Sequence, residues 1–232
     1  MSNQNYPNHR SMKELCEELK RNNEVSSEKV LNCLMNIDRA DFAPRNVYQN
    51  RAQSIPCNVV ISAPHLHGYC LQALENFLTE GSTVLDIGFG SGYLTVAMSK
   101  MMGDKGCVVG VEHMEKLYKL GEENIKKHHK DLLDNGKIEL KFGEGRTYFK
   151  DKAPFKCIHV GAAANEAPQV FLDQLEIGGR LVIPLGTKDN YNSNQFIYFI
   201  DKVAEGQFKY TQGLSVRYVD LTTVEKQNLG YV

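Results

Sequence analysis

Short apolar runs alternate with amphipathic stretches through the middle of the chain. The apolar runs are rich in β-branched residues and predict buried strands near 83–87, 107–112, 138–142, 156–160 and 180–184. Between these runs, apolar residues recur at helical spacing and predict helices near 91–102, 114–130 and 167–175. Regular alternation of strand and helix is typical of an α/β fold with a doubly wound, mostly parallel sheet.

The segment before this alternating region predicts helices and one long connection. Capping serines precede two amphipathic stretches, at Ser11 and Ser27, and Pro64 suits the first turn of a third helix. Residues 38–56 show little periodicity and predict a connection, and residues 57–62 predict a short strand. The alternating core therefore carries an N-terminal helical extension.

After Pro184 the alternation of helix and strand stops. A polar loop over 188–194 precedes two stretches that predict strands, 195–203 and 209–221, joined by a turn at Gly206. An antiparallel pair at the edge of a parallel sheet is common. We therefore expect a seven-stranded sheet with an antiparallel C-terminal edge.

A glycine-rich turn follows the first strand of the core. Its sequence is D-x-G-x-G-x-G, with Asp86 in the strand and glycines at 88, 90 and 92. Glycine lacks a Cβ and tolerates positive φ, so a nucleotide-like ligand can approach this backbone closely. The dinucleotide fingerprint needs a third glycine where this chain has Tyr93, which disfavours a nicotinamide cofactor bound through its pyrophosphate. The turn suits S-adenosylmethionine, which has no phosphate; a tight turn without a ligand is the alternative.

A carboxylate ends the next apolar run. Glu112 lies about 20 residues beyond Gly90, the offset at which an acid meets the ribose hydroxyls of a bound nucleotide. The two features together predict binding of an adenosine with free 2′- and 3′-hydroxyls.

Composition removes several classes of function. The 232 residues carry a net charge of −1, so nothing draws the chain as a whole to nucleic acid or to a membrane surface. No apolar run approaches ~18 residues, and the polar N-terminus does not resemble a signal peptide. Six cysteines without a C-x-x-C pair predict reduced thiols in a cytoplasmic protein, with no metal-ligand spacing. No heptad run is present, so we expect a monomer.

Further segments resemble the protein-L-isoaspartate (D-aspartate) O-methyltransferase family, within the class I S-adenosylmethionine-dependent methyltransferase superfamily. Residues 60–67 are similar to its I-S-A-P-H-x-H segment, and residues 157–164 are similar to its I-H-V-G-A-A strand and turn. Further matches lie at 84–93, 143–146, 173–184 and 218–222, of which the match at 84–93 is shared by the whole superfamily. The resemblance runs from about residue 11 to residue 227, and the first two segments are specific to the family.

The resemblance implies a reaction and a domain organisation. It implies methyl transfer from S-adenosylmethionine, leaving S-adenosylhomocysteine, to the α-carboxylate of L-isoaspartyl residues in damaged proteins and peptides, with D-aspartyl residues as a second candidate. The ester returns to a succinimide, part of which opens to normal Asp. After a disordered N-terminus at 1–10, residues 11–232 would form one domain. Its parts would be a substrate-side helical region (11–80), a cofactor-binding core (81–185) and C-terminal strands with a substrate-side segment (186–232).

The resemblance also assigns site residues. Those expected to bind the cofactor are Val59, Val60, Ile61, Ser62, His67, Asp86, Gly88, Phe89, Gly90, Glu112, His113, Glu144, Gly145, Thr222 and Gln227. Those expected to contact the substrate are Ala63, His65, Val216, Arg217 and Tyr218, the last three by pairing with an extended peptide.

Ser62 is the expected catalytic residue. Its hydroxyl would bond the substrate carboxylate and aim one oxygen at the methyl group. The alternative is that Ser62 caps the helix that begins at Pro64, and both roles are compatible.

Some positions depart from the family's pattern, and other functions stay open. Phe89 stands where relatives often have Ser, Glu112 and Glu144 replace Asp, and Asp220 replaces Pro. The alternatives are a class I methyltransferase with another acceptor and a non-catalytic module that binds S-adenosylmethionine.

Overall fold

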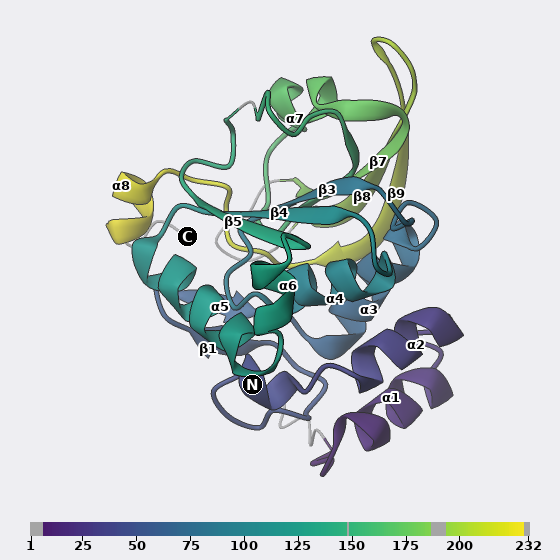
Figure 1. Ribbon diagram of the computed structural model, residues 1–232, viewed down its shortest axis with the longest axis vertical. Helices are drawn as coiled ribbons and strands as arrows, with labels where there is room; N and C mark the ends of the chain where they lie inside the picture. Colours follow the sequence, from purple (N-terminus) through teal and green to yellow (C-terminus); the bar gives the residue numbers. More distant parts are fainter. Residues whose placement is uncertain (1–6, 148, 187–193, 230–232) are drawn as a thin grey trace.

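The computed structural model describes residues 7–147, 149–186 and 194–229, and its centre is a seven-stranded sheet (Figure 1). The strand order is β5-β4-β3-β6-β7-β8-β9. The bounds are β3 (Thr83–Ile87), β4 (Cys107–Glu112), β5 (Ile138–Phe142), β6 (Phe155–Val160), β7 (Leu175–Leu185), β8 (Gln195–Ala204) and β9 (Gln207–Val216). Strands β3 to β7 pair in parallel, whereas β8 and β9 are antiparallel. The predicted fold class and antiparallel edge are confirmed.

Alternate residues of the central strands enter two hydrophobic cores on opposite faces of the sheet. Val84 and Val108 face one core, and their neighbours Leu85 and Val109 face the other. The first core lies under four helices: α3 (Pro64–Leu74), α4 (Tyr93–Met101), α5 (Glu115–His128) and α6 (Lys130–Asp134). Figure 1 shows these helices on one side of the sheet and α7 (Gln169–Asp173) on the other.

The N-terminal helices form a further layer whose apolar faces extend the first core. Helix α1 (Met12–Arg21) packs on α2 (Glu28–Met35), which packs on α3 and α4. The hydroxyls of Ser11 and Ser27 cap these helices by accepting bonds from backbone N–H groups, as the sequence predicts. Of residues 1–10, expected to be disordered, the first six lie outside the described part; His9 contacts Glu18.

A short helical turn and the first strand of a β-hairpin lie in the segment predicted to be a connection. Strand β1 (Gln53–Ile55) pairs antiparallel with β2 (Val59–Ile61), and the 3₁₀ helix η1 covers Arg39–Asp41. The short strand predicted over 57–62 is confirmed as β2, whereas its partner β1 lies in the segment predicted to be a connection. Three-residue strands are too short to show alternation, and the hairpin turn uses Cys57 and Asn58 at positive φ in place of glycine.

Other boundaries differ by a few residues. The helix predicted over 114–130 is broken at His129, which leaves helical geometry between α5 and α6. The strand predicted over 209–221 ends at Val216, and a short helix, α8 (Val224–Asn228), follows it. In the loop predicted over 188–194, residues 188–193 lie outside the described part. Across the three described ranges, no helix has the length and apolar character to cross a bilayer.

Candidate functional site

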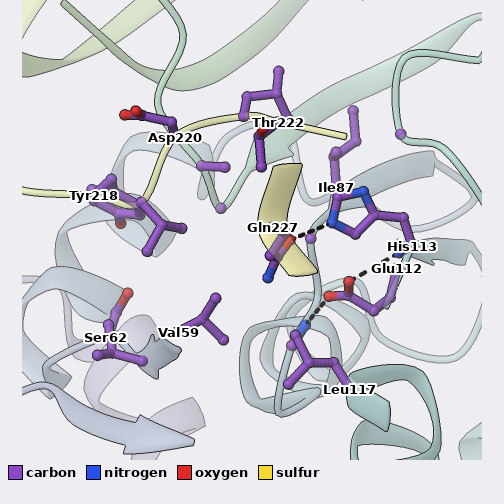
Figure 2. A pocket seen from close by; sticks show the side chains of 18 of the residues that line it. Val59, Ser62, Ile87, Glu112, His113, Leu117, Tyr218, Asp220, Thr222 and Gln227 are labelled. Atoms are coloured by element: carbon purple, nitrogen blue, oxygen red, sulfur yellow. Dashed lines mark hydrogen bonds between the residues drawn. The ribbon is translucent and has the colours of Figure 1, made fainter. Parts of the chain in front are cut away.

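A cavity of about 160 Å³ lies where β3 and β4 end, beside the hairpin and under the C-terminal segment. Parallel strands commonly bind ligands at this end of a sheet. Figure 2 shows its labelled side chains in two groups facing each other across the cavity. One group includes Val59, Ser62 and Tyr218, and the other includes Glu112, His113 and Gln227.

A smaller cavity of about 50 Å³ adjoins the first. The two share the residues Val60, Ser62, Gly88, Gly90, Gly161 and Tyr218. The smaller cavity adds polar groups, namely those of His67, Asp86, Ser91 and His159. Ser62 therefore lies at the junction of an elongated site with two chemically different ends.

The glycine turn forms the floor of this junction. Gly88 and Gly90 have φ of 74° and 50°, and a Cβ added to Gly88 would meet no other atom within 4 Å. Gly161 at the end of β6 approaches the turn so closely that its Cβ would lie 2.9 Å from the Gly88 oxygen. Backbone rather than side chain therefore lines this part of the site, which permits the close approach expected from the sequence.

Glu112 is a buried carboxylate held by main-chain donors. Its Oε1 accepts bonds from the N–H groups of His113 (2.9 Å) and Met114 (3.0 Å), and its Oε2 accepts one from Gly90 (3.2 Å). Burial raises the pKa of Glu112, and the bonds to the main chain act in the opposite direction. These donors fix the carboxylate at the wall of the larger cavity while leaving acceptor capacity for a ligand.

Asp86 forms the polar wall of the smaller cavity together with His159. Asp86 Oδ2 accepts a bond from Thr95 Oγ1 at 2.6 Å, and Asp86 Oδ1 lies 2.9 Å from His159 Nδ1. Burial favours the neutral imidazole, but the hydrogen bonds to Asp86 and Cys70 outweigh it and raise the pKa of His159 to about 10. The buried carboxylate at 86 is thus balanced by an imidazolium.

Ser62 lies between the hairpin and α3, and it does not cap the helix. The residue before the first turn of α3 is Ala63, and the helix begins at Pro64. The side chain of Asn50 reaches the start of this helix and accepts a bond from His65 N at 3.0 Å. Ser62 has no part in starting the helix, and the residue lines both cavities. Burial raises the pKa of the neighbouring Tyr218 phenol, and a hydrogen bond with Ser62 lowers it by a smaller amount.

Comparison with known proteins now identifies the family. The family model for protein-L-isoaspartate(D-aspartate) O-methyltransferase matches residues 10–226. The chain belongs to this family. The resemblance stated from sequence motifs is thereby confirmed.

Family members from distant organisms match over nearly their whole length. A Caenorhabditis elegans protein-L-isoaspartate O-methyltransferase is 42% identical over 214 residues, which cover 92% of this chain and 93% of the relative. The Arabidopsis thaliana protein-L-isoaspartate O-methyltransferase 1 is 40% identical over 221 residues, 94% of each chain. A Plasmodium falciparum crystal structure described as this methyltransferase, in complex with S-adenosyl-L-homocysteine, superposes with a TM-score of 0.84. Its identity is 31%, over 92% of this chain and 99% of that one.

Every residue expected to bind the family's cofactor lines one of the two cavities. The resemblance assigns Ile61, Ser62 and His67 to the methionine part of the cofactor; Ile61 and His67 line the smaller cavity, and Ser62 lines both. Those assigned to ribose and adenine line the larger one: Glu112, His113, Glu144 and Gly145.

The substrate-side residues are only partly brought together. Ala63, Arg217 and Tyr218 line the larger cavity. His65 and Val216 line neither cavity: the Nδ1 atom of His65 lies 2.8 Å from Asn50 Oδ1, and Val216 pairs with Gln195 between β8 and β9. The structure does not gather these two residues at the site.

Phe89 lines the smaller cavity, but its ring serves the core. The ring packs against Tyr118, with centroids 5.8 Å apart, and lies under Gly110 and Gly121. A Cβ on Gly121 would lie 2.5 Å from the Phe89 ring. Phe89 therefore supplies packing for α5 where a serine would supply a hydroxyl.

Two residues next to the site, His159 and Arg39, were not predicted from the sequence, for different reasons. His159 belongs to a quoted motif, but its partnership with Asp86 depends on the pairing of β6 with β3. Arg39 lies in the segment predicted to be a connection, and no pattern near it signals burial. In the part of the chain that the structure describes, no group of three or more His, Cys, Asp or Glu could hold a metal ion.

Proposed function

We propose that this chain transfers a methyl group from S-adenosylmethionine to the α-carboxylate of L-isoaspartyl residues in proteins and peptides. The observation that carries the proposal is the position of Ser62 at the junction of the two cavities. A methyl acceptor held by this hydroxyl lies beside the point where the two halves of the cofactor would join. The amide nitrogen of the following residue would then displace methanol from the ester and form a succinimide, which begins repair of the damaged residue.

The residues present fit S-adenosylmethionine. The buried Glu112 carboxylate has the acceptor chemistry for a ribose diol, and the glycine turn leaves room where a Cβ would project. Asp86 and His67 offer an acceptor and a donor to an amino acid end. When bound, S-adenosylmethionine supplies an electrophilic methyl group on a positively charged sulfur.

The chain's own residues would act by positioning. The nucleophile is a carboxylate, which is already ionised near neutral pH, so no general base is required. The Ser62 hydroxyl donates to one carboxylate oxygen and directs the other toward the smaller cavity. Holding the two reactants in contact within the site excludes water and lowers the entropic cost of the encounter.

The substrate would lie along the segment that follows β9. Arg217 is exposed at the cavity and supplies a cation, while Tyr218 is buried beside Ser62. An extended peptide adding at Val216–Tyr218 would carry its isoaspartyl carboxylate to the Ser62 hydroxyl. We propose contact of His65 with the substrate as a more distant part of the same surface.

The wider setting is also proposed. We infer a monomer acting in the cytoplasm on aged proteins, without nucleic acid or membrane partners. All six cysteines are free thiols, which supports a reducing compartment. Activity on D-aspartyl residues is a second part of the proposal.

One assay tests the reaction and its selectivity together. The protein is mixed with methyl-labelled S-adenosylmethionine and two peptides that differ only in isoaspartyl or aspartyl linkage, and base-labile methyl ester is counted. Label on the isoaspartyl peptide alone is expected. Label on neither peptide, with S-adenosylhomocysteine still bound, would point to another acceptor or to a binding module.

A further inference from the structure

Arg39 is a fully buried cation next to the site, and the mechanism described so far does not use it. It lies in η1, and its side chain has no measurable exposure. No described carboxylate forms an ion pair with it, and its Nε has no hydrogen-bond partner within the described ranges. Burial lowers the pKa of Arg39 to about 10, with the nearby Tyr93 acting in the opposite direction, so the guanidinium stays charged at neutral pH.

The contacts of Arg39 converge on the junction of the two cavities. Its Nη2 donates to the backbone oxygen of Ser62 at 2.7 Å, and its Nη1 lies 3.4 Å from His67 Nδ1. The guanidinium carbon lies 5.5 Å from the centre of the Tyr93 ring, on which the His67 ring stacks at 5.0 Å. Arg39 therefore contacts both the proposed catalytic serine and a histidine of the smaller cavity.

These contacts determine which nitrogen of His67 carries the proton. A guanidinium only donates hydrogen bonds, so Nδ1 of His67 must accept. Burial lowers the pKa of His67 well below its ordinary value, and the Arg39 charge acts in the same direction. The imidazole is thus neutral with its single proton on Nε2. Arg39 does not line the smaller cavity and His67 does, so the edge turned to the cavity is the one remote from Nδ1.

We propose that Arg39 is a positioning residue that holds the Ser62 loop and fixes His67 as the Nε2–H tautomer. His67 then presents a hydrogen-bond donor to the carboxylate of the cofactor's amino acid end. This inference rests on the proposed function, because it places that end in the smaller cavity.

The unpaired charge gives the arrangement a second consequence. A buried cation without a counter-ion is costly, and the cost falls when an anion arrives nearby. Two carboxylates would arrive here, one on the cofactor and one on the substrate. Arg39 therefore favours the ligand-bound state more than the empty one.

The first test is spectroscopic and uses the unmodified protein. Long-range proton–nitrogen NMR spectra of protein labelled with ¹⁵N-histidine distinguish the two neutral tautomers and the imidazolium, and loss of one signal in His67→Gln assigns it. At pH 7 we expect the Nε2–H tautomer, with and without S-adenosylhomocysteine. Observation of the Nδ1–H tautomer or of an imidazolium overturns the inference.

The second test compares two Arg39 variants with an exposed arginine. Arg39→Met is expected to weaken S-adenosylhomocysteine binding about tenfold or more and to mix the His67 tautomers. Arg39→Lys keeps the charge with a single donor site and should recover part of the affinity. Arg10→Met, at a distant exposed pair with Glu14, should change neither quantity.

The outcomes separate this inference from the proposed function. If the wild-type protein methylates the isoaspartyl peptide but Arg39→Met keeps its tautomer and full affinity, the positioning role alone fails. If the wild-type protein methylates neither peptide, the proposed function fails, and the tautomer measurement still decides the role of Arg39. If Arg39→Met does not fold, Arg39→Lys and the wild-type spectrum give the answer.

Discussion

The side-chain oxygen of Gln227 lies 2.6 Å from Nε2 of His113, across 114 positions of sequence. The Gln227 amide also donates to the backbone oxygen of Cys57 in the hairpin turn, at 3.4 Å. One side chain thus joins α8 to the end of β4 and to the hairpin, and Figure 2 shows it beside the cavity. This link closes the larger cavity from the C-terminal side.

Removing the link should speed release of the cofactor product. Gln227→Ala loses both bonds, and we expect S-adenosylhomocysteine to dissociate about tenfold faster because partly buried polar contacts of this kind stabilise the closed form. Stopped-flow displacement measures the rate. Asn228→Ala, an exposed change on the same helix, is the control and should leave the rate unaltered.

Ser62→Ala should separate catalysis from cofactor binding. The hydroxyl acts on the acceptor, so kcat should fall by about 10²-fold while the calorimetric affinity for S-adenosylhomocysteine changes little. Thr79→Ala, which removes an exposed hydroxyl that lines neither cavity, is the matched control. An unchanged kcat in Ser62→Ala would exclude the positioning role.

Glu112→Ala should weaken cofactor binding at least tenfold. The carboxylate is the proposed acceptor for the ribose hydroxyls, and a hydrogen bond to a charged group contributes about 1.5–3 kcal/mol. Titration calorimetry with S-adenosylhomocysteine gives the affinity. Glu115→Ala removes an exposed carboxylate at the start of α5 and should have no effect. Equal affinities for the two variants would refute the ribose assignment.

Restoring the hydroxyl that relatives carry at position 89 should damage the protein rather than improve it. Phe89→Ser removes a side chain that is 5% exposed and whose ring fills the space over Gly110 and Gly121. The free energy of unfolding of this variant should be lower than that of the wild type by about 3 kcal/mol. Phe142→Ser removes a ring that is 59% exposed and should change it by less than about 1 kcal/mol, as urea unfolding would measure.

Stability should fall with rising pH because of His159. Its pKa is raised to about 10 in the folded chain against about 6.5 unfolded, so its contribution is complete below pH 6.5 and lost as the pH rises toward 10. Between pH 7 and 9 the free energy of unfolding should decrease by about 2 kcal/mol more than in His159→Gln. Buried thiols with a raised pKa, such as Cys157, act in the same direction, so the comparison is the difference between the two proteins. Parallel pH profiles would mean that His159 is not protonated in the native state.

The strands that the sequence predicts best are those with a clear local pattern. Strands β3, β4 and β5 have the predicted bounds, because β3 and β4 are mainly apolar runs and β5 alternates apolar and charged residues. Strand β1 and helix α8 were not predicted from the sequence. Both are short, and contacts with distant residues, such as that of Gln227 with His113, hold α8 in place.

The residues of the site likewise differ in whether a local sequence pattern predicts them. Asp86 and Glu112 each end or interrupt an apolar run, so local sequence signals them. Arg39 bonds residues 23 and 28 positions away, and only the folded chain brings them together. The sequence shows that Phe89 departs from the family's pattern. It does not show that Gly110 and Gly121 make room for the ring, because that depends on how α5 packs on the sheet.

Tyr93 shows how firmly the choice of nucleotide is built into this chain. It stands where a dinucleotide turn requires glycine, and its ring supports His67, lies beneath the Arg39 guanidinium and meets the edge of Phe42. Replacing it with glycine would alter one letter of the motif but remove a shared support from the N-terminal segment and from the smaller cavity at once. A change of cofactor class by this route would therefore be strongly epistatic, with each substitution harmful until several others accompany it.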